Sequence, residues 1–105
     1  MNADILNILY AASLEFGEDW RRPLPELAKE RLSHLNETEI TEAAALIYDV
    51  RNNIEQLMFD NYTKINERTV SKDQIKKEIQ TRYPWMNEEN VDHGFSQGMY
   101  YAWHG

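Results

Sequence analysis

One segment of this sequence, residues 38–62, constrains the fold more than any other because its 25 residues contain no proline or glycine. Asn36 and Glu39 have the spacing of a capping box, in which two side chains satisfy backbone N–H groups at a helix start. Apolar residues then recur with a helical period. They are Ile40, Ala43, Leu46, Ile47, Val50, Ile54, Leu57 and Met58. We therefore expect one long central helix against which the other helices pack.

The back of this long helix carries a weaker apolar stripe. Its members are Ala44, Ala45, Tyr48 and Phe59. A central helix in a small bundle contacts several neighbours, so we expect the stripe to be buried. The alternative is that it forms the seam of a homodimer.

Further helices are predicted on either side by their start and stop signals. Asn2 can cap a first helix and Gly17 can end it, while Pro25 suits the first position of a helix over residues 25–35. A second capping box, Ser71 with Gln74, starts a helix that Pro84 stops, and Asn87 can cap the last one. With no strand alternation, the sequence predicts a single all-α domain over residues 1–105, a compact bundle of about five helices.

Charge and composition exclude several classes of function. Residues 1–60 hold 12 acids and 5 bases, whereas residues 61–105 hold 6 of each, and the net charge is −7. This field repels phosphate, so we expect no direct nucleic acid binding and a basic protein partner. There is no cysteine, no basic leader and no apolar run of the roughly 18 residues that a membrane span needs. We therefore expect a cytoplasmic protein that does not bind membranes.

The string Gly94-Phe95-Ser96-Gln97-Gly98 resembles the nucleophile elbow of α/β-hydrolases, in particular the carboxylesterase and acyl-protein thioesterase branch. The elbow requires a strand before its serine, and an acid and a histidine later in the chain. Here a predicted helix start precedes Ser96, and His104 but no Asp or Glu follows. The resemblance covers five residues, and we expect Ser96 to be an ordinary helix residue.

The same letters fit a helix that packs closely. At about 100° per residue, Gly94, Gly98 and Ala102 form a small-residue stripe that lets two backbones approach. An alternative is that the glycines leave room for a small ligand. The residues of that alternative pocket are Gly94, Gly98, Tyr101, Trp85 and Met99.

The opposite face of this last helix is unusually aromatic. It holds His93, Ser96, Gln97, Tyr100, Trp103 and His104. Tyr and Trp are enriched in binding hot spots, so Tyr100, Trp103 and Trp20 are candidates for anchoring a partner. Burial of the helix on both sides is the structural alternative. The candidates for electrostatic steering of a basic partner are Glu18, Asp19, Glu37, Glu39 and Glu42.

Catalytic and metal-binding patterns are weak. Glu30 with His34 and Glu89 with His93 have an i, i+4 spacing, but no Glu-x-x-His occurs, nor does a phosphate-binding loop or a cysteine nucleophile. We expect no metal, no cofactor and no enzymatic activity. The sequence predicts a small acidic interaction module, an inhibitor, immunity-type or regulatory protein that is a monomer or a homodimer. The alternative is a helical protein that binds a small ligand.

Overall fold

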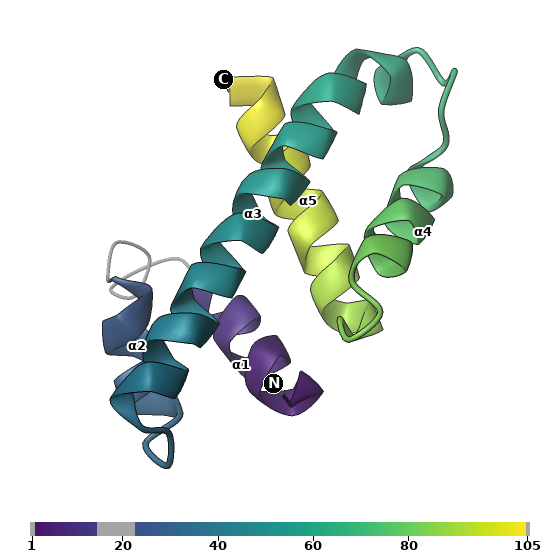
Figure 1. Ribbon diagram of the computed structural model, residues 1–105. Coiled ribbons are helices and arrows are strands. Elements are labelled where there is room, and N and C mark those ends of the chain that lie inside the picture. The colour runs from purple at the N-terminus through teal and green to yellow at the C-terminus, as the bar shows by residue number, and fades with distance from the viewer. Residues whose placement is uncertain (1, 15–22, 105) are drawn as a thin grey trace. The chain divides into compact units, whose positions relative to one another are not determined.

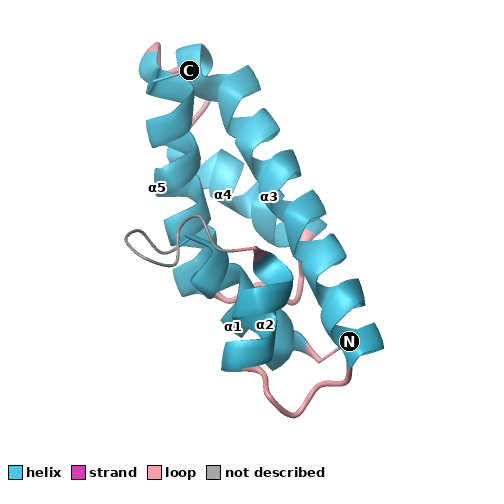
Figure 2. Ribbon diagram, turned by 90° about the vertical axis from the view of Figure 1, so that its left-hand side faces the viewer, coloured by secondary structure: helices cyan, strands magenta, loops and turns pink. Residues whose placement is uncertain are grey.

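The computed structural model describes residues 2–14 and 23–104, and within these ranges helices joined by turns and loops are present and no strand is found (Figures 1 and 2). Five α-helices follow one another along the chain. They are α1 (Ala3–Leu14), α2 (Leu24–Arg31), α3 (Glu37–Asn66), α4 (Lys72–Arg82) and α5 (Glu88–His104). The predicted class, an all-α bundle of about five helices with one long helix, is confirmed.

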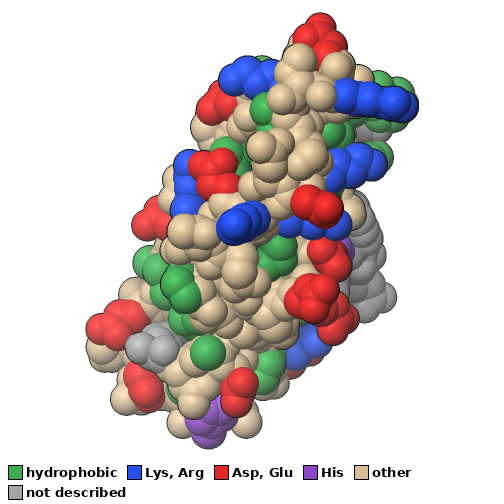
Figure 3. Space-filling model, turned by 90° about the vertical axis from the view of Figure 1, so that its right-hand side faces the viewer, with side chains coloured by type: hydrophobic (Ala, Val, Ile, Leu, Met, Phe, Trp, Pro, Cys, Tyr) green, Lys and Arg blue, Asp and Glu red, His purple; other side chains and the backbone are tan. Residues whose placement is uncertain are grey.

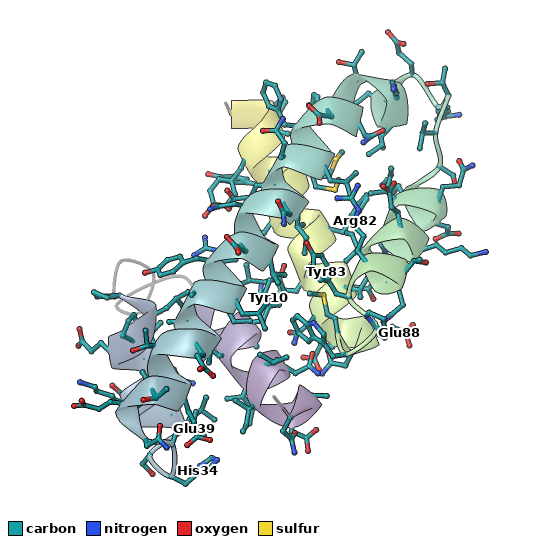
Figure 4. All side chains as sticks on the ribbon, viewed as in Figure 1. Tyr10, His34, Glu39, Arg82, Tyr83 and Glu88 are labelled. Atoms are coloured by element: carbon teal, nitrogen blue, oxygen red, sulfur yellow. The ribbon has the colours of Figure 1, made fainter. Side chains whose placement is uncertain are left out.

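Helix α3 begins where the capping box predicts. The backbone N–H of Glu39 donates to Asn36 Oδ1 over 2.8 Å, and the N–H of Asn36 donates to Glu39 Oε1 over 3.1 Å. Figure 4 labels Glu39 in this first turn. The helix runs to Asn66, four residues past the predicted end, for 30 residues.

The end of α3 explains why the prediction stopped short. Arg68 has a φ of 60°, the left-handed conformation that usually marks a glycine. Its N–H donates to the carbonyl of Ile65, and the N–H of Thr69 donates to the carbonyl of Lys64 over 2.9 Å. These two bonds make a Schellman motif without its usual glycine. The sequence signal for the end of α3 is therefore absent.

The stripes along α3 are mostly placed as predicted, with four corrections. Ile47, Val50 and Met58 are buried, but Leu46 is 39% exposed. At about 100° per residue Leu46 lies about 100° from Ile47, at the edge of the buried face. In the second stripe Ala44 is buried, whereas Tyr48 and Phe59 are exposed, so their predicted burial is wrong. Ala45 is exposed as well.

The chain divides into two compact units, Met1–Val50 and Arg51–Gly105, and the division falls inside α3. In the first unit α1 packs against α2. The buried side chains there include Leu9, Tyr10, Leu24, Leu27 and Ile47. Tyr48, although partly exposed, accepts a hydrogen bond at its hydroxyl from the N–H of Leu24 over 3.3 Å. It thereby satisfies a backbone donor in the first turn of α2, which has no side-chain cap.

In the second unit α4 packs beside α5. Lys76 on α4 lies 3.1 Å from Asp92 Oδ1 and 5.3 Å from the ring centre of Phe95, both on α5. The Ser71 and Gln74 capping box starts α4, as predicted. Asn87 caps α5 as predicted, because its Oδ1 accepts from the N–H of Asn90 over 2.8 Å.

The corner between α4 and α5 is held by one amide side chain. Gln80 donates from Nε2 to the carbonyls of Met86 and Tyr83, over 2.8 and 3.3 Å. Figure 4 labels Tyr83 and Glu88 on the two sides of this corner. Gln80 of α4 therefore holds the backbone of the turn that leads into α5. The prediction of a single domain over the whole chain stays a prediction.

Candidate interaction surface

Helix α5 packs closely against α3 at Gly98. This glycine is buried, and a Cβ built on it would collide with Cγ of Met58 and lie 3.0 Å from Met58 Cβ. Figure 1 shows the C-terminal half of α3 and α5 crossing in this unit. The predicted role of Gly98 in close helix packing is confirmed, and Gly94 is buried on the same stripe.

The residues of the alternative ligand pocket do not gather in one place. Met58 fills the space over Gly98. Trp85 lies at the corner before α5, where its ring centre is 6.1 Å from that of Tyr83. Tyr101 lies 13 residues beyond Glu88, the first residue of α5, which at 1.5 Å per residue is about 20 Å along the helix. Trp85 and Tyr101 therefore belong to opposite ends of α5.

Beside the Gly98 contact, α3 and α5 leave an open groove of about 420 Å³. We call it the α3–α5 groove. Its walls are formed by four residues of α3 and two of α5: Asn52, Glu55, Gln56, Phe59, Tyr101 and Ala102. All six belong to the second unit. The groove is open rather than enclosed, which suits part of a larger partner better than a whole small molecule.

Large aromatic side chains are exposed in and around this groove. Phe59 is 60% exposed in the groove wall, and Tyr100 and Trp103 are 51% and 67% exposed on the outer side of α5. The ring of Tyr101 connects the two regions, because it lines the groove and lies edge-on to Tyr100 with 5.7 Å between ring centres. Burial of the aromatic face on both sides is thus wrong for Tyr100 and Trp103.

The polar members of that outer face are placed unequally. Ser96 and His93 are exposed, as a solvated face requires. Gln97, expected with them, is instead 95% buried, since its exposed fraction is 5%. Gln97 and Tyr101 are four residues apart, which places them about 40° from each other around the helix. Gln97 therefore lies on the same side of α5 as the half-buried Tyr101.

Ser96 lies in the middle of α5 and is exposed to solvent. A nucleophile elbow places its serine at a turn between a strand and a helix. Among the residues that the structure describes, no strand precedes this serine. The G-x-S-x-G sequence is therefore present, but Ser96 does not lie at a turn between a strand and a helix.

The predicted steering residues divide into two groups. Glu18 and Asp19 lie outside the described residues, as does Trp20, which was predicted as an anchor. Of the others, Glu37 and Glu42 are exposed, while Glu39 is half-buried and its carboxylate takes part in the capping box. Glu39 therefore has a local structural role in addition to its charge.

The first unit carries most of the negative charge. Met1–Val50 holds 10 acids and 4 bases, a net charge of −6, and Arg51–Gly105 holds 8 acids and 7 bases, a net charge of −1. Figure 3 shows one side of the molecule, on which acidic and basic side chains are interspersed. The asymmetry predicted from the sequence thus coincides with the division into units.

The described residues show neither a metal-binding group nor a membrane-spanning helix. His34 is exposed in the turn after α2 and is labelled in Figure 4. In residues 2–14 and 23–104, no three His, Asp or Glu side chains are grouped so that they could hold an ion. Over the same ranges, no helix has both the length and the apolar character of a bilayer-crossing segment.

The α3–α5 groove was not predicted from the sequence, although one signal was available. Asn52, Glu55, Gln56 and Phe59 have the i, i+3, i+4, i+7 spacing of one helix face, and three of the four are polar. A single exposed ring on a polar face is common on protein surfaces, so this signal becomes informative only when Tyr101 of α5 is placed with Phe59 in the groove. Comparisons of this chain with protein-family models, with curated proteins and with solved structures found no match.

Proposed function

We propose that this protein is a non-catalytic interaction module that binds a basic partner protein through α5 and the α3–α5 groove. The observation that carries the proposal is the exposure of Phe59, Tyr100 and Trp103 in one compact unit. Large aromatic side chains are costly to leave in water and are the residue types that dominate binding energy in interfaces.

Charge supports the choice of a basic partner. The chain carries a net charge of −7, of which −6 belongs to the first unit. Such a field accelerates the encounter with a positively charged protein and disfavours acidic partners. An inhibitor, an immunity-type protein or a regulator of a basic protein fits this combination of acidic charge and aromatic contacts.

The proposal is tested by affinity purification with three forms of the full chain. These are the parent protein, a Tyr100→Ala, Trp103→Ala double variant, and a control double variant, Ile8→Ala with Leu46→Ala. The control removes two other exposed apolar side chains, which belong to the first unit. Circular dichroism first establishes that all three are folded.

We expect mass spectrometry to identify a basic protein that the parent and the control recover and that the Tyr100, Trp103 variant loses. The purified partner then gives the affinity directly, and we expect loss of the two rings to weaken it at least about tenfold, because each truncated hot spot costs about 1–2 kcal/mol or more. Equal recovery by all three forms would contradict the proposal.

A homodimer through Phe59 and Tyr48 is the alternative use of the exposed rings. Both side chains are exposed on α3, as the seam interpretation requires. Light scattering across a dilution series distinguishes the two, because a homodimer doubles the mass at high concentration and a heterologous interaction module does not. A Phe59→Ala variant then shows whether any association depends on this ring.

A further inference from the structure

The chemistry of the α3–α5 groove narrows the kind of side chain that it accepts. This step rests on the proposed function, since it concerns the same surface and the same basic partner. The groove wall contains two aromatic rings, Phe59 and Tyr101, two carboxamides, Asn52 and Gln56, and the carboxylate of Glu55. Glu55 is the one formally charged group among the six residues of the wall.

The Glu55 carboxylate is accessible and oriented. Its side chain is 40% exposed, and the nearest guanidinium nitrogen of Arg51 lies 3.6 Å from Oε1. That distance is longer than a hydrogen bond, so Arg51 attracts the carboxylate without occupying it as a direct donor. The Arg51 side chain is 20% exposed and is not among the residues that line the groove.

The Gln56 amide is also oriented by its own helix. Its Nε2 donates to Asp60 Oδ1 over 2.8 Å. This bond engages one of the two hydrogens on the amide nitrogen, and the carbonyl oxygen of the same amide is a hydrogen-bond acceptor. The wall therefore presents acceptors, Glu55 and Gln56, next to the two aromatic faces. A group that fits must donate several hydrogen bonds, carry positive charge and have a flat apolar face.

We infer that the α3–α5 groove receives an arginine side chain of the basic partner. A guanidinium is planar, stacks on Phe and Tyr rings, and donates several N–H bonds at once to a carboxylate and a neighbouring carbonyl oxygen. A lysine ammonium supplies the charge but neither the flat face nor the fork of donors. Arginine is thus the basic side chain that uses every kind of group in the wall.

The test uses the full ¹⁵N-labelled chain and three capped tripeptides that differ in one side chain. They are acetyl-Gly-Arg-Gly-amide, the same peptide with lysine, and the same peptide with citrulline, which keeps the shape of arginine without its charge. The readout is the shift of the side-chain amide signals of Asn52 and Gln56 and of the backbone signal of Tyr101 during titration.

We expect the arginine peptide to shift these three signals in a saturable way. We expect the lysine peptide to bind roughly fivefold more weakly and the citrulline peptide to cause no saturable shift, because the stacked, forked contact needs a charged guanidinium. Glu55→Gln, which keeps the size of the side chain, is expected to weaken arginine binding about fivefold or more. Glu42→Gln, an exposed carboxylate of the first unit, is the control and leaves it unchanged.

Equal shifts with the arginine and citrulline peptides, or a response unaffected by Glu55→Gln, overturn the inference. The inference and the proposed function can fail separately. If the purified partner depends on Tyr100 and Trp103 but binds the Glu55→Gln variant as tightly as the parent, the interaction stands and the arginine site is wrong. If the arginine peptide binds as expected and no partner depends on Tyr100 and Trp103, the guanidinium site stands and the proposed function is wrong.

Discussion

Arg68 ends helix α3 in a position that is usually occupied by glycine. It takes the left-handed conformation, with a φ of 60°, at the end of α3. A side chain in this conformation costs about 1–2 kcal/mol, which glycine avoids because it has no Cβ. The Schellman bonds of Thr69 and Arg68 hold the backbone there. The backbone conformation at Arg68 therefore favours glycine over arginine.

We expect Arg68→Gly to raise the free energy of unfolding by about 0.5–1 kcal/mol, since relief of the left-handed strain exceeds the entropy that glycine adds to the unfolded chain. Arg68→Ala is the matched control. It removes the same charge and keeps a Cβ, so we expect no such gain. Urea denaturation of the three proteins measures the difference, and a glycine variant no more stable than the alanine variant would be evidence against the strain.

Several single positions were predictable from sequence because their physics is local. The two capping boxes, Asn36 with Glu39 and Ser71 with Gln74, need only a hydroxyl or amide three residues before a carboxylate or amide. The end of α3 could not be predicted, because arginine carries no sign of the conformation that its hydrogen bonds impose. Gln97 was misplaced for another reason, since its exposure depends on which way α5 turns against its neighbours.

At the scale of elements, the contact between α3 and α5 depends on the absence of a side chain. Met58 occupies the place of a Cβ at Gly98, and its own Cβ and Cγ are the atoms that such a group would meet. These atoms are close to the backbone of α3 and cannot swing aside as the end of a flexible chain could. Met58 is fully buried, so it has no free space to move into.

We expect Gly98→Ala to lower the free energy of unfolding by about 1 kcal/mol. Alanine gains about 1 kcal/mol in helix propensity, but overpacking in a filled contact costs about 1–3 kcal/mol. Chemical denaturation measures the change. Ser96→Ala, an exposed position of the same helix, is the control and is expected to be neutral or slightly stabilising.

A second variant makes the Gly98 prediction specific to Met58. Met58→Ala removes the Cγ that collides, so Gly98→Ala placed in that background should cost less than it does in the parent protein. A double-mutant cycle reports this coupling, which we expect to be about 1 kcal/mol in favour of the pair. If the cost of Gly98→Ala is the same in both backgrounds, Met58 is not its cause.

The elements themselves were largely predictable, and the surface between them was not. Periodicity and caps indicate where each helix lies, and they identify the buried face of α3 apart from Leu46 at its edge. The α3–α5 groove lies between residues of two helices that are far apart in sequence. Its geometry depends on packing between residues 40 positions apart, Met58 and Gly98, which no local pattern specifies.

At the scale of the whole molecule, the negative charge is divided unevenly between the two units. The first unit carries −6 and the second −1, although they are similar in length. A field of this kind acts on a partner before contact is made and is screened over about 10 Å at 0.1 M salt. It affects the rate of association more than the lifetime of the complex.

We expect the Glu37→Gln, Glu42→Gln double variant to associate with the basic partner about two- to fivefold more slowly than the parent at low ionic strength, with a much smaller difference in high salt. Glu39 is left intact because it takes part in the cap of α3. Stopped-flow association rates at two salt concentrations measure the effect. Glu37→Asp with Glu42→Asp keeps the charge and should associate like the parent, and a salt-independent rate in the parent would exclude steering.

The division between the two units, after Val50, lies within helix α3. In most proteins such a boundary falls in a flexible linker instead. A protease needs an extended stretch of chain, and these two residues are held in a continuous helix. A cut here would divide α3 into two shorter helices, each of which loses the hydrogen bonds that cross the division. The two units are therefore joined by a continuous helix, and neither can be produced alone without truncating α3.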